Sequence, residues 1–220
     1  MKIKITQPTK LKEIKLSQYT KFLRTTKDSE DEMFIAKQLV GIFCNLPDNI
    51  VNQINVKEFD AIVKDLTELL NTEHELVTTF SLHGVEYGFI PSFEDITIGE
   101  KVDLDLFYKD IDNIGKAMNV LYRPITIKQK GKYLIKEYNG NGESLDVTLD
   151  VAFGANVFFS DLMSDLLSYT QSFIAQEVER NPKVSQTLAQ NGVGITHSTE
   201  SLSLIISQLK KQLKGNYTLN

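Results

Sequence analysis

Four carboxylates near the middle of the chain lie close enough in sequence to suggest a hydrolytic centre or a cation site. They are Asp95, Glu100, Asp103 and Asp105. Asp103 and Asp105 are two residues apart, so in a helix their side chains diverge by about 200° and do not converge on one ion. Acidic residues near the start of a helix are also stabilised by the helix dipole. We therefore expect this group to be structural, neither catalytic nor metal-binding.

Three other features suggest chemistry, and each lacks a part that the chemistry needs. His74 and Glu75 begin like the zinc-protease motif HExxH, but Thr78 stands where the second imidazole ligand must be. The residues 192–194, Gly-Val-Gly, fit neither glycine pattern of a phosphate-binding loop. Cys44, the single cysteine, excludes an internal disulfide and lies in GIFCNL, which is typical of a buried helix end. We expect no enzymatic activity and no cofactor.

One aromatic and cationic group has the composition of a protein interface. It consists of Tyr122, Arg123, Tyr133 and Tyr138. Tyrosine and arginine are enriched among the residues that dominate binding energy at protein interfaces. The alternative is a set of partly buried tyrosines on a sheet, and the sequence leaves both interpretations open.

The sequence signals for the helices and strands that must position these residues are most closely spaced over residues 87–125. A strand is expected before Pro91, which cannot donate to a strand ladder. Thr97 and Glu100 have the capping-box spacing for the start of the next helix, and a second short helix begins at Asp112 or Asn113. In the first helix the predicted apolar stripe is Val102 and Leu106 with Leu104 and Phe107, while the predicted water-facing residues are Glu100, Lys101, Asp103, Asp105 and Lys109.

Four segments of the chain resemble segments of known proteins. They are YGFIPSFEDITIGEKVDLD, NIGKAMNVLYRPI, YLIKEYNG and VAFGANVFFSDLMSDLL. They resemble a recurrent block in uncharacterised proteins of tailed bacteriophages, particularly the crAss-like phages that infect Bacteroidetes. The resemblance implies a non-enzymatic virion structural protein, such as a ring or adaptor subunit at the portal–tail neck. It also implies contacts with copies of itself and with other virion proteins. The alternative is a non-virion tail-assembly chaperone, which the N-terminal order of helices and the run LPDNIVNQINVKEFDAIVKDLTELL resemble.

The bulk properties fit such a protein. The 220 residues are 41% hydrophobic and 24% charged, which is ordinary for a globular chain. A net charge of −5 argues against general or sequence-specific nucleic-acid binding. No stretch reaches the roughly 18 apolar residues of a membrane helix. We expect the protein to be made in the host cytoplasm and to end in the virion.

Both ends of the chain are basic, against an acidic middle. This pattern indicates either solvated termini or docking onto an acidic partner protein. The lysines concerned are Lys2, Lys4, Lys10, Lys12 and Lys15 near the start and Lys210, Lys211 and Lys214 near the end.

The predicted architecture is an α+β domain over residues 1–178, with two β-hairpins packed against about five helices. Its parts are a helical N-terminal lobe, 1–72, and a hairpin/helix module, 73–178. Turns at His83-Gly84 and Lys130-Gly131 predict the hairpins. Residues 2–5 are expected to form a strand paired with 11–16, and residues 149–178 the longest helix. We expect Leu106, Leu121 and Phe158 in the core.

Residues 179–220 are predicted to form a linker followed by an amphipathic helix over 201–213. Such a short helix is marginal alone, so packing must hold it. We expect it to dock on another subunit of an oligomer, with docking on its own body as the alternative. The candidate interface residues are Leu202, Ile205, Ile206 and Leu209, and the same helix also carries Leu204 and Leu213.

Overall fold

The computed structural model describes residues 5–91 and 96–158 of the chain. Residues up to Ala155 belong to one compact unit, and Asn156 begins another. The first unit is described below. The predicted linker and C-terminal helix, with Leu202, Ile205, Ile206 and Leu209, lie outside the described residues, as do residues 2–4 and Asp95.

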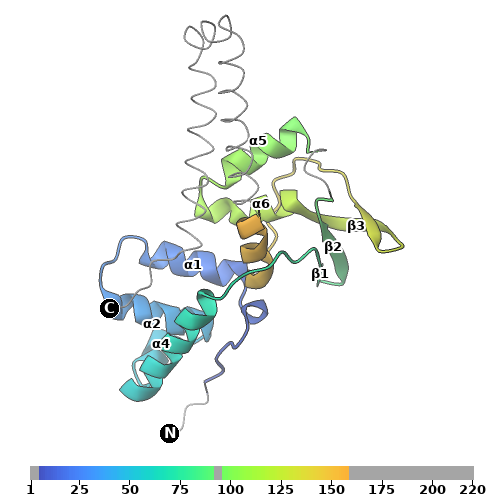
Figure 1. Ribbon diagram of the computed structural model, residues 1–220. Helices are drawn as coiled ribbons and strands as arrows, with labels where there is room; N and C mark the ends of the chain where they lie inside the picture. Colours follow the sequence, from blue (N-terminus) through green and yellow to red (C-terminus); the bar gives the residue numbers. More distant parts are fainter. Residues whose placement is uncertain (1–4, 92–95, 159–220) are drawn as a thin grey trace, which may run out of the picture. The chain divides into compact units, whose positions relative to one another are not determined.

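The N-terminal part is a lobe of helices (Figure 1), namely α1 (Leu16–Thr26), α2 (Glu32–Phe43), α3 (Asp48–Val51) and α4 (Val56–Leu70). Asn55 caps the start of α4, because its side chain accepts a hydrogen bond from the backbone N–H of Glu58. Its apolar face is buried against the lobe and consists of Phe59, Ile62, Val63, Leu66 and Leu70. Leu66 is completely buried.

The pairing predicted for residues 11–16 differs from the one observed. A short 3-10 helix, η1 (Leu11–Glu13), occupies the first half of this stretch. Lys15 instead bridges Thr148 in antiparallel fashion. The backbone N–H of Leu16 donates to Val147 and that of Leu149 donates to Ile14, both over 2.9 Å. The sequence pattern shows that this edge needs a partner but does not show which distant segment supplies it.

The strands are β1 (Thr79–Leu82), β2 (Val85–Phe89), β3 (Tyr122–Gln129) and β4 (Lys132–Ile135). Both predicted hairpins are confirmed, since His83-Gly84 and Lys130-Gly131 connect the strands with φ values of 50° and 79°, and 51° and 77°. Two consecutive positive φ values are what a tight hairpin turn requires. Pairing of β2 with β3 joins the hairpins into one antiparallel sheet of order β1-β2-β3-β4.

Between β2 and β3 lie α5 (Ile98–Phe107), the 3-10 turn η2 (Ile111–Asn113) and α6 (Ile114–Leu121). Residues 149–158 are helical, in agreement with the predicted start of the longest helix. The α+β class is therefore confirmed. Among the described residues no helix is both long and apolar enough to cross a membrane.

The predicted orientation of α5 is confirmed for Leu104 and Phe107 and is wrong for Val102, Leu106 and Glu100. Glu100, Leu104 and Phe107 are its buried residues, at 3%, 1% and 8% exposure. Val102 and Leu106 were expected inside but are 57% and 56% exposed. Glu100, Leu104 and Phe107, at positions i, i+4 and i+7 of the helix, therefore form the buried face of α5.

Of the three predicted core residues only Leu121 is confirmed, with 0% exposure. Leu106 is wrong for the reason just given, and Phe158 is 37% exposed. The core is formed by completely or almost completely buried side chains from the lobe, from α5 and α6, and from residues 147–155. They include Ile14, Phe22, Val40, Leu66, Leu104, Tyr108, Ile114, Met118, Tyr122 and Leu149.

The helix over residues 149–155 links the lobe to the sheet module. The ring of Phe153 packs edge-on against Tyr19 of α1, with 5.0 Å between ring centroids. It also packs at a tilt against His74, just after α4, with 4.8 Å between ring centroids. A Cβ atom on Gly154 would overlap the backbone carbonyl oxygen of Glu75. Only a glycine lets the helix and the chain entering β1 approach this closely.

Candidate functional site

The most buried ion pair among the described residues joins α5 to β3. Arg123 follows α6 directly as the second residue of β3, and Glu100 lies in the first turn of α5. The guanidinium Nη2 lies 2.7 Å from Oε1 of Glu100, and the two side chains are only 12% and 4% exposed. A charge-assisted hydrogen bond of this length is among the stronger polar contacts in proteins.

The other oxygen of Glu100 is held by the helix cap. Oε2 accepts hydrogen bonds from the backbone N–H and from the hydroxyl of Thr97, both over 2.7 Å. The backbone N–H of Glu100 donates to the Thr97 hydroxyl in return, over 3.2 Å. The predicted capping box is therefore confirmed, with both oxygens of the Glu100 carboxylate engaged.

Tyr138 completes the group from the segment after β4. Its hydroxyl donates to Oδ2 of Asp103 over 2.6 Å. Burial, and after it the hydrogen bond to Asp103, raise the pKa of Tyr138 above its ordinary value, so the phenol stays protonated. We call Glu100, Asp103, Arg123 and Tyr138 the α5–β3 cluster. Two of the predicted interface residues, Arg123 and Tyr138, thus lie together.

The other two predicted interface residues hold the sheet. Tyr122 is completely buried, and its hydroxyl donates to the carbonyl of Val77 over 2.8 Å. Tyr133 donates to the carbonyl of Phe89 over 2.9 Å, and its ring covers Gly88, where a Cβ atom would overlap it. The four residues therefore do not form one exposed aromatic surface.

A small polar cavity lies beside the cluster. Its volume is about 100 Å³, enough for a few water molecules. Arg123 and Lys136 bring positive charge to its wall, and Glu137 and Glu143 bring negative charge. Nε of Arg123 is buried with no hydrogen-bond partner. The mixed charges give the cavity no clear preference for an anion or a cation.

Of the four carboxylates that suggested chemistry, the three that the structure describes, Glu100, Asp103 and Asp105, do not form one metal-binding group. Glu100 is buried in its ion pair, and Asp105 lies 4.0 Å from Lys101 one turn earlier in α5. Among the described residues no group of three histidine, cysteine or acidic side chains could hold a metal ion. The prediction that Glu100 faces water is wrong, because its side chain is buried in the ion pair with Arg123. The capping box is evident from the spacing of Thr97 and Glu100 in the sequence, but no sequence pattern indicates that Glu100 pairs with Arg123.

Two isolated reactive side chains are withdrawn from solvent, Cys44 being buried and His74 half-buried. Cys44 ends α2, and burial raises the pKa of its thiol to about 11. A thiol with this pKa is almost entirely protonated at neutral pH and is a poor nucleophile. Burial against Phe153 lowers the pKa of His74, which favours the neutral imidazole.

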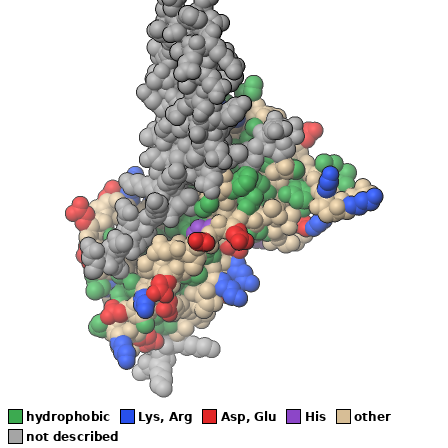
Figure 2. Space-filling view, viewed as in Figure 1, with side chains coloured by type: hydrophobic (Ala, Val, Ile, Leu, Met, Phe, Trp, Pro, Cys, Tyr) green, Lys and Arg blue, Asp and Glu red, His purple; other side chains and the backbone are tan. Residues whose placement is uncertain are grey.

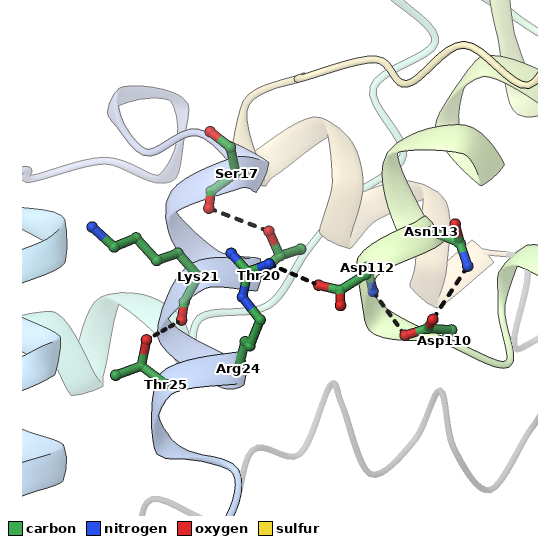
Figure 3. A network of polar contacts seen from close by, with 8 residues as sticks. All are labelled: Ser17, Thr20, Lys21, Arg24, Thr25, Asp110, Asp112 and Asn113. Atoms are coloured by element: carbon green, nitrogen blue, oxygen red, sulfur yellow. Dashed lines mark hydrogen bonds and ion pairs between the residues drawn. The ribbon is translucent and has the colours of Figure 1, made fainter.

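A second polar network, at the surface, joins the lobe to the sheet module (Figure 3). Arg24 of α1 reaches Asp112 of η2 over 3.7 Å. Asp110 accepts hydrogen bonds from the backbone of Asp112 and from the side chain of Asn113. The Arg24 and Asp112 side chains are 64% and 50% exposed, so water screens this pair and its contribution to stability is small.

Two apolar groups face solvent. Ile98, Val102 and Leu106 are 83%, 57% and 56% exposed and follow one another at four-residue steps along α5, a group that we call the α5 stripe. Ile127 and Leu134 oppose each other across β3 and β4 and are 57% and 59% exposed. Hydrophobic side chains are visible on the surface over both regions (Figure 2).

No family model matches the chain, and comparisons with curated proteins and with solved structures found no similar protein.

Proposed function

We propose that this protein is a non-enzymatic structural protein of a tailed bacteriophage, a subunit of a ring or adaptor at the portal–tail neck. It acts by binding copies of itself and other virion proteins. The four segments that resemble phage proteins support the assignment to a tailed bacteriophage. The observation that carries the binding role is the α5 stripe.

The stripe spans two turns of helix, so its first and last side chains start about 12 Å apart. Single exposed apolar residues are ordinary on protein surfaces, whereas a contiguous apolar patch is typical of an interaction site. Burying Ile98, Val102 and Leu106 in an interface would contribute roughly 1.5 to 3 kcal/mol for each side chain that becomes fully covered.

The polar groups support a role without catalysis. The Glu100 carboxylate and the Arg123 guanidinium form an ion pair, and the Tyr138 hydroxyl donates a hydrogen bond to Asp103. Groups engaged in this way position a helix on a sheet, and none of them is set to transfer a proton to a substrate. The alternative role, a tail-assembly chaperone, is supported by the helical order of the N-terminal lobe.

Two measurements test the proposal. Mass spectrometry of purified particles of a phage that encodes the chain should find it at a fixed ratio to the portal protein. Detection in the infected cell but not in particles would favour the chaperone. Light scattering on the isolated protein should give the mass of an oligomer.

The α5 stripe is tested separately. Val102→Glu should weaken self-association or incorporation into particles, because a carboxylate in an apolar contact loses its hydration. Lys57→Gln, at an exposed position of α4, makes the same change in net charge and should have no effect. Equal behaviour of the two variants, in a protein that is monomeric and absent from particles, would rule out the structural role.

A further inference from the structure

The β3–β4 hairpin is a basic surface on an acidic protein. Residues 122–136 include Arg123, Lys128, Lys130, Lys132 and Lys136 and no aspartate or glutamate, whereas the whole chain has a net charge of −5. All four lysines are exposed. Lys128 pairs with Glu86 of β2, and in the described part of the chain no ion pair engages the other three.

The basic hairpin also carries an exposed apolar pair. Ile127 and Leu134 lie directly opposite each other, more than half exposed, between the lysines. β4 is the last strand of the sheet, so one of its edges has no neighbouring strand among the described residues. Figure 2 shows Lys and Arg side chains together with hydrophobic ones at the end of this hairpin, on the right of the view.

An acidic surface of matching composition lies on the helical lobe. After the exposed Lys27, the loop between α1 and α2 and the first turn of α2 carry four exposed acidic residues, Asp28, Glu30, Asp31 and Glu32. Met33 follows at 56% exposure. Asp31 caps α2 by accepting hydrogen bonds from the backbone N–H groups of Met33 and Phe34. We call residues 28–33 the acidic loop.

These two surfaces do not meet within one copy. The α1–α2 loop and the β3–β4 hairpin lie at opposite ends of the described body (Figure 1). A contact between these two surfaces therefore requires two molecules.

We propose that the β3–β4 hairpin of one copy docks on the acidic loop of a second copy. The lysines face the carboxylates, and Ile127 and Leu134 pack against Met33. The two surfaces differ, so the contact is head-to-tail, and repeated head-to-tail contacts close into a ring when the rotation between neighbours allows it. This inference rests on the proposed self-association and identifies the surfaces that produce it.

Charge complementarity of this kind mainly sets the specificity and the register of an interface. Nucleic acid is the other class of partner that lysines attract. It is less favoured, because the three lysines without an ion pair belong to a chain whose net charge repels phosphate.

Charge reversal tests the pairing directly. Lys130→Glu with Lys132→Glu should weaken self-association about tenfold or more, and so should Glu30→Lys with Glu32→Lys, because like charges then face each other. All four substitutions in one chain should restore association, since the charges have been exchanged. Lys57→Glu with Lys64→Glu, on exposed positions of α4, is the control for net charge and should leave association unchanged.

The measurement is sedimentation velocity at low and high salt, with circular dichroism to confirm that each variant is folded. Failure of the fourfold variant to restore association, or unchanged association after hairpin reversal, overturns the inference and leaves the proposed function standing. A wild-type chain that is monomeric at every concentration overturns both. Retention of labelled duplex DNA that is lost on hairpin reversal, with association unchanged, would assign the hairpin to nucleic acid instead.

Discussion

The neighbouring helices α5 and α6 use apolar residues in opposite ways. α6 buries nearly all of its side chains, with Ile114, Ala117, Met118, Val120 and Leu121 each at most 1% exposed. α5 buries a carboxylate, Glu100, and leaves Ile98, Val102 and Leu106 in solvent. Both helices lie in the same connection between β2 and β3.

The difference shows that two kinds of force orient these helices. α6 is held by close packing, since a Cβ atom on Gly115 would overlap the hydroxyl of Ser144. α5 is oriented by its cap and its ion pair, which turn Glu100 toward Arg123. Burying Glu100 exposes the opposite face of the helix, and that face is the α5 stripe.

The largest expected effect comes from breaking the ion pair that orients α5. Glu100→Gln should lower the free energy of unfolding by roughly 3 to 5 kcal/mol, because it leaves the guanidinium of Arg123 buried without a counter-charge. Urea unfolding measures the loss. Replacing both partners, with Glu100→Leu and Arg123→Met, should recover much of it.

If the double replacement is as unstable as Glu100→Gln, the geometry of the cap rather than charge neutralisation holds α5 in place. A loss below about 1 kcal/mol for Glu100→Gln would contradict the view that this pair orients the helix.

The next largest effect comes from truncating an apolar side chain, which should destabilise the protein in α6 but not in α5. Leu121→Ala in α6 should cost roughly 2 to 5 kcal/mol, because it removes a completely buried side chain and leaves a cavity. Leu106→Ala in α5 is the matched control and should change the free energy of unfolding by at most about 0.5 kcal/mol. Equal losses in thermal or urea unfolding of the monomer would mean that α5 packs by the face predicted from its sequence.

Removing the residues that precede α5 and α6 at their N-termini should give a smaller difference in the free energy of unfolding. Thr97→Ala should cost about 0.5 to 2 kcal/mol, since its hydroxyl accepts from the backbone of Glu100. Asn113 precedes α6 without a side-chain cap hydrogen bond, so Asn113→Ala should cost clearly less. Urea unfolding of both variants compares them, and a greater loss at Asn113 would contradict the assignment of the caps.

The smallest expected effect concerns alkaline pH. The folded protein raises the pKa of Tyr138, so the stabilisation from this group is complete below the ordinary tyrosine pKa of about 10 and is lost as the pH rises above it. Tyr138→Phe should make the decline in unfolding free energy above about pH 10 less steep. Identical slopes for the two proteins would show that Asp103 does not hold the phenol proton.

Local structure was largely predictable from the sequence. The turns at His83-Gly84 and Lys130-Gly131, the cap at Asn55 and the capping box at Thr97 each depend on residues within four positions of one another, and the structure contains all of them. Such features follow from backbone geometry and from satisfaction of free N–H groups, which the sequence specifies directly.

The orientation of α5 and the α5–β3 cluster were not predictable in the same way. α5 has apolar residues on two faces, and the hydrophobic pattern alone does not choose between Leu104 with Phe107 and Val102 with Leu106. The choice depends on Arg123, which lies outside the helix and pairs with Glu100 only after the sheet has formed. Similarly, no local pattern identifies residues 147–149 as the partner of 14–16.

The contact between those two segments has a consequence for the order of events on the ribosome. The first backbone N–H groups of α1 are satisfied late, because Leu16 donates to Val147 and Ser17 donates to Asp146, 129 residues away. Domains generally begin to fold from the N-terminus while they are being translated. Here the start of α1 stays incomplete until residues 146–149 have left the exit tunnel, so the first helix of the lobe is completed only after the sheet module has been synthesised.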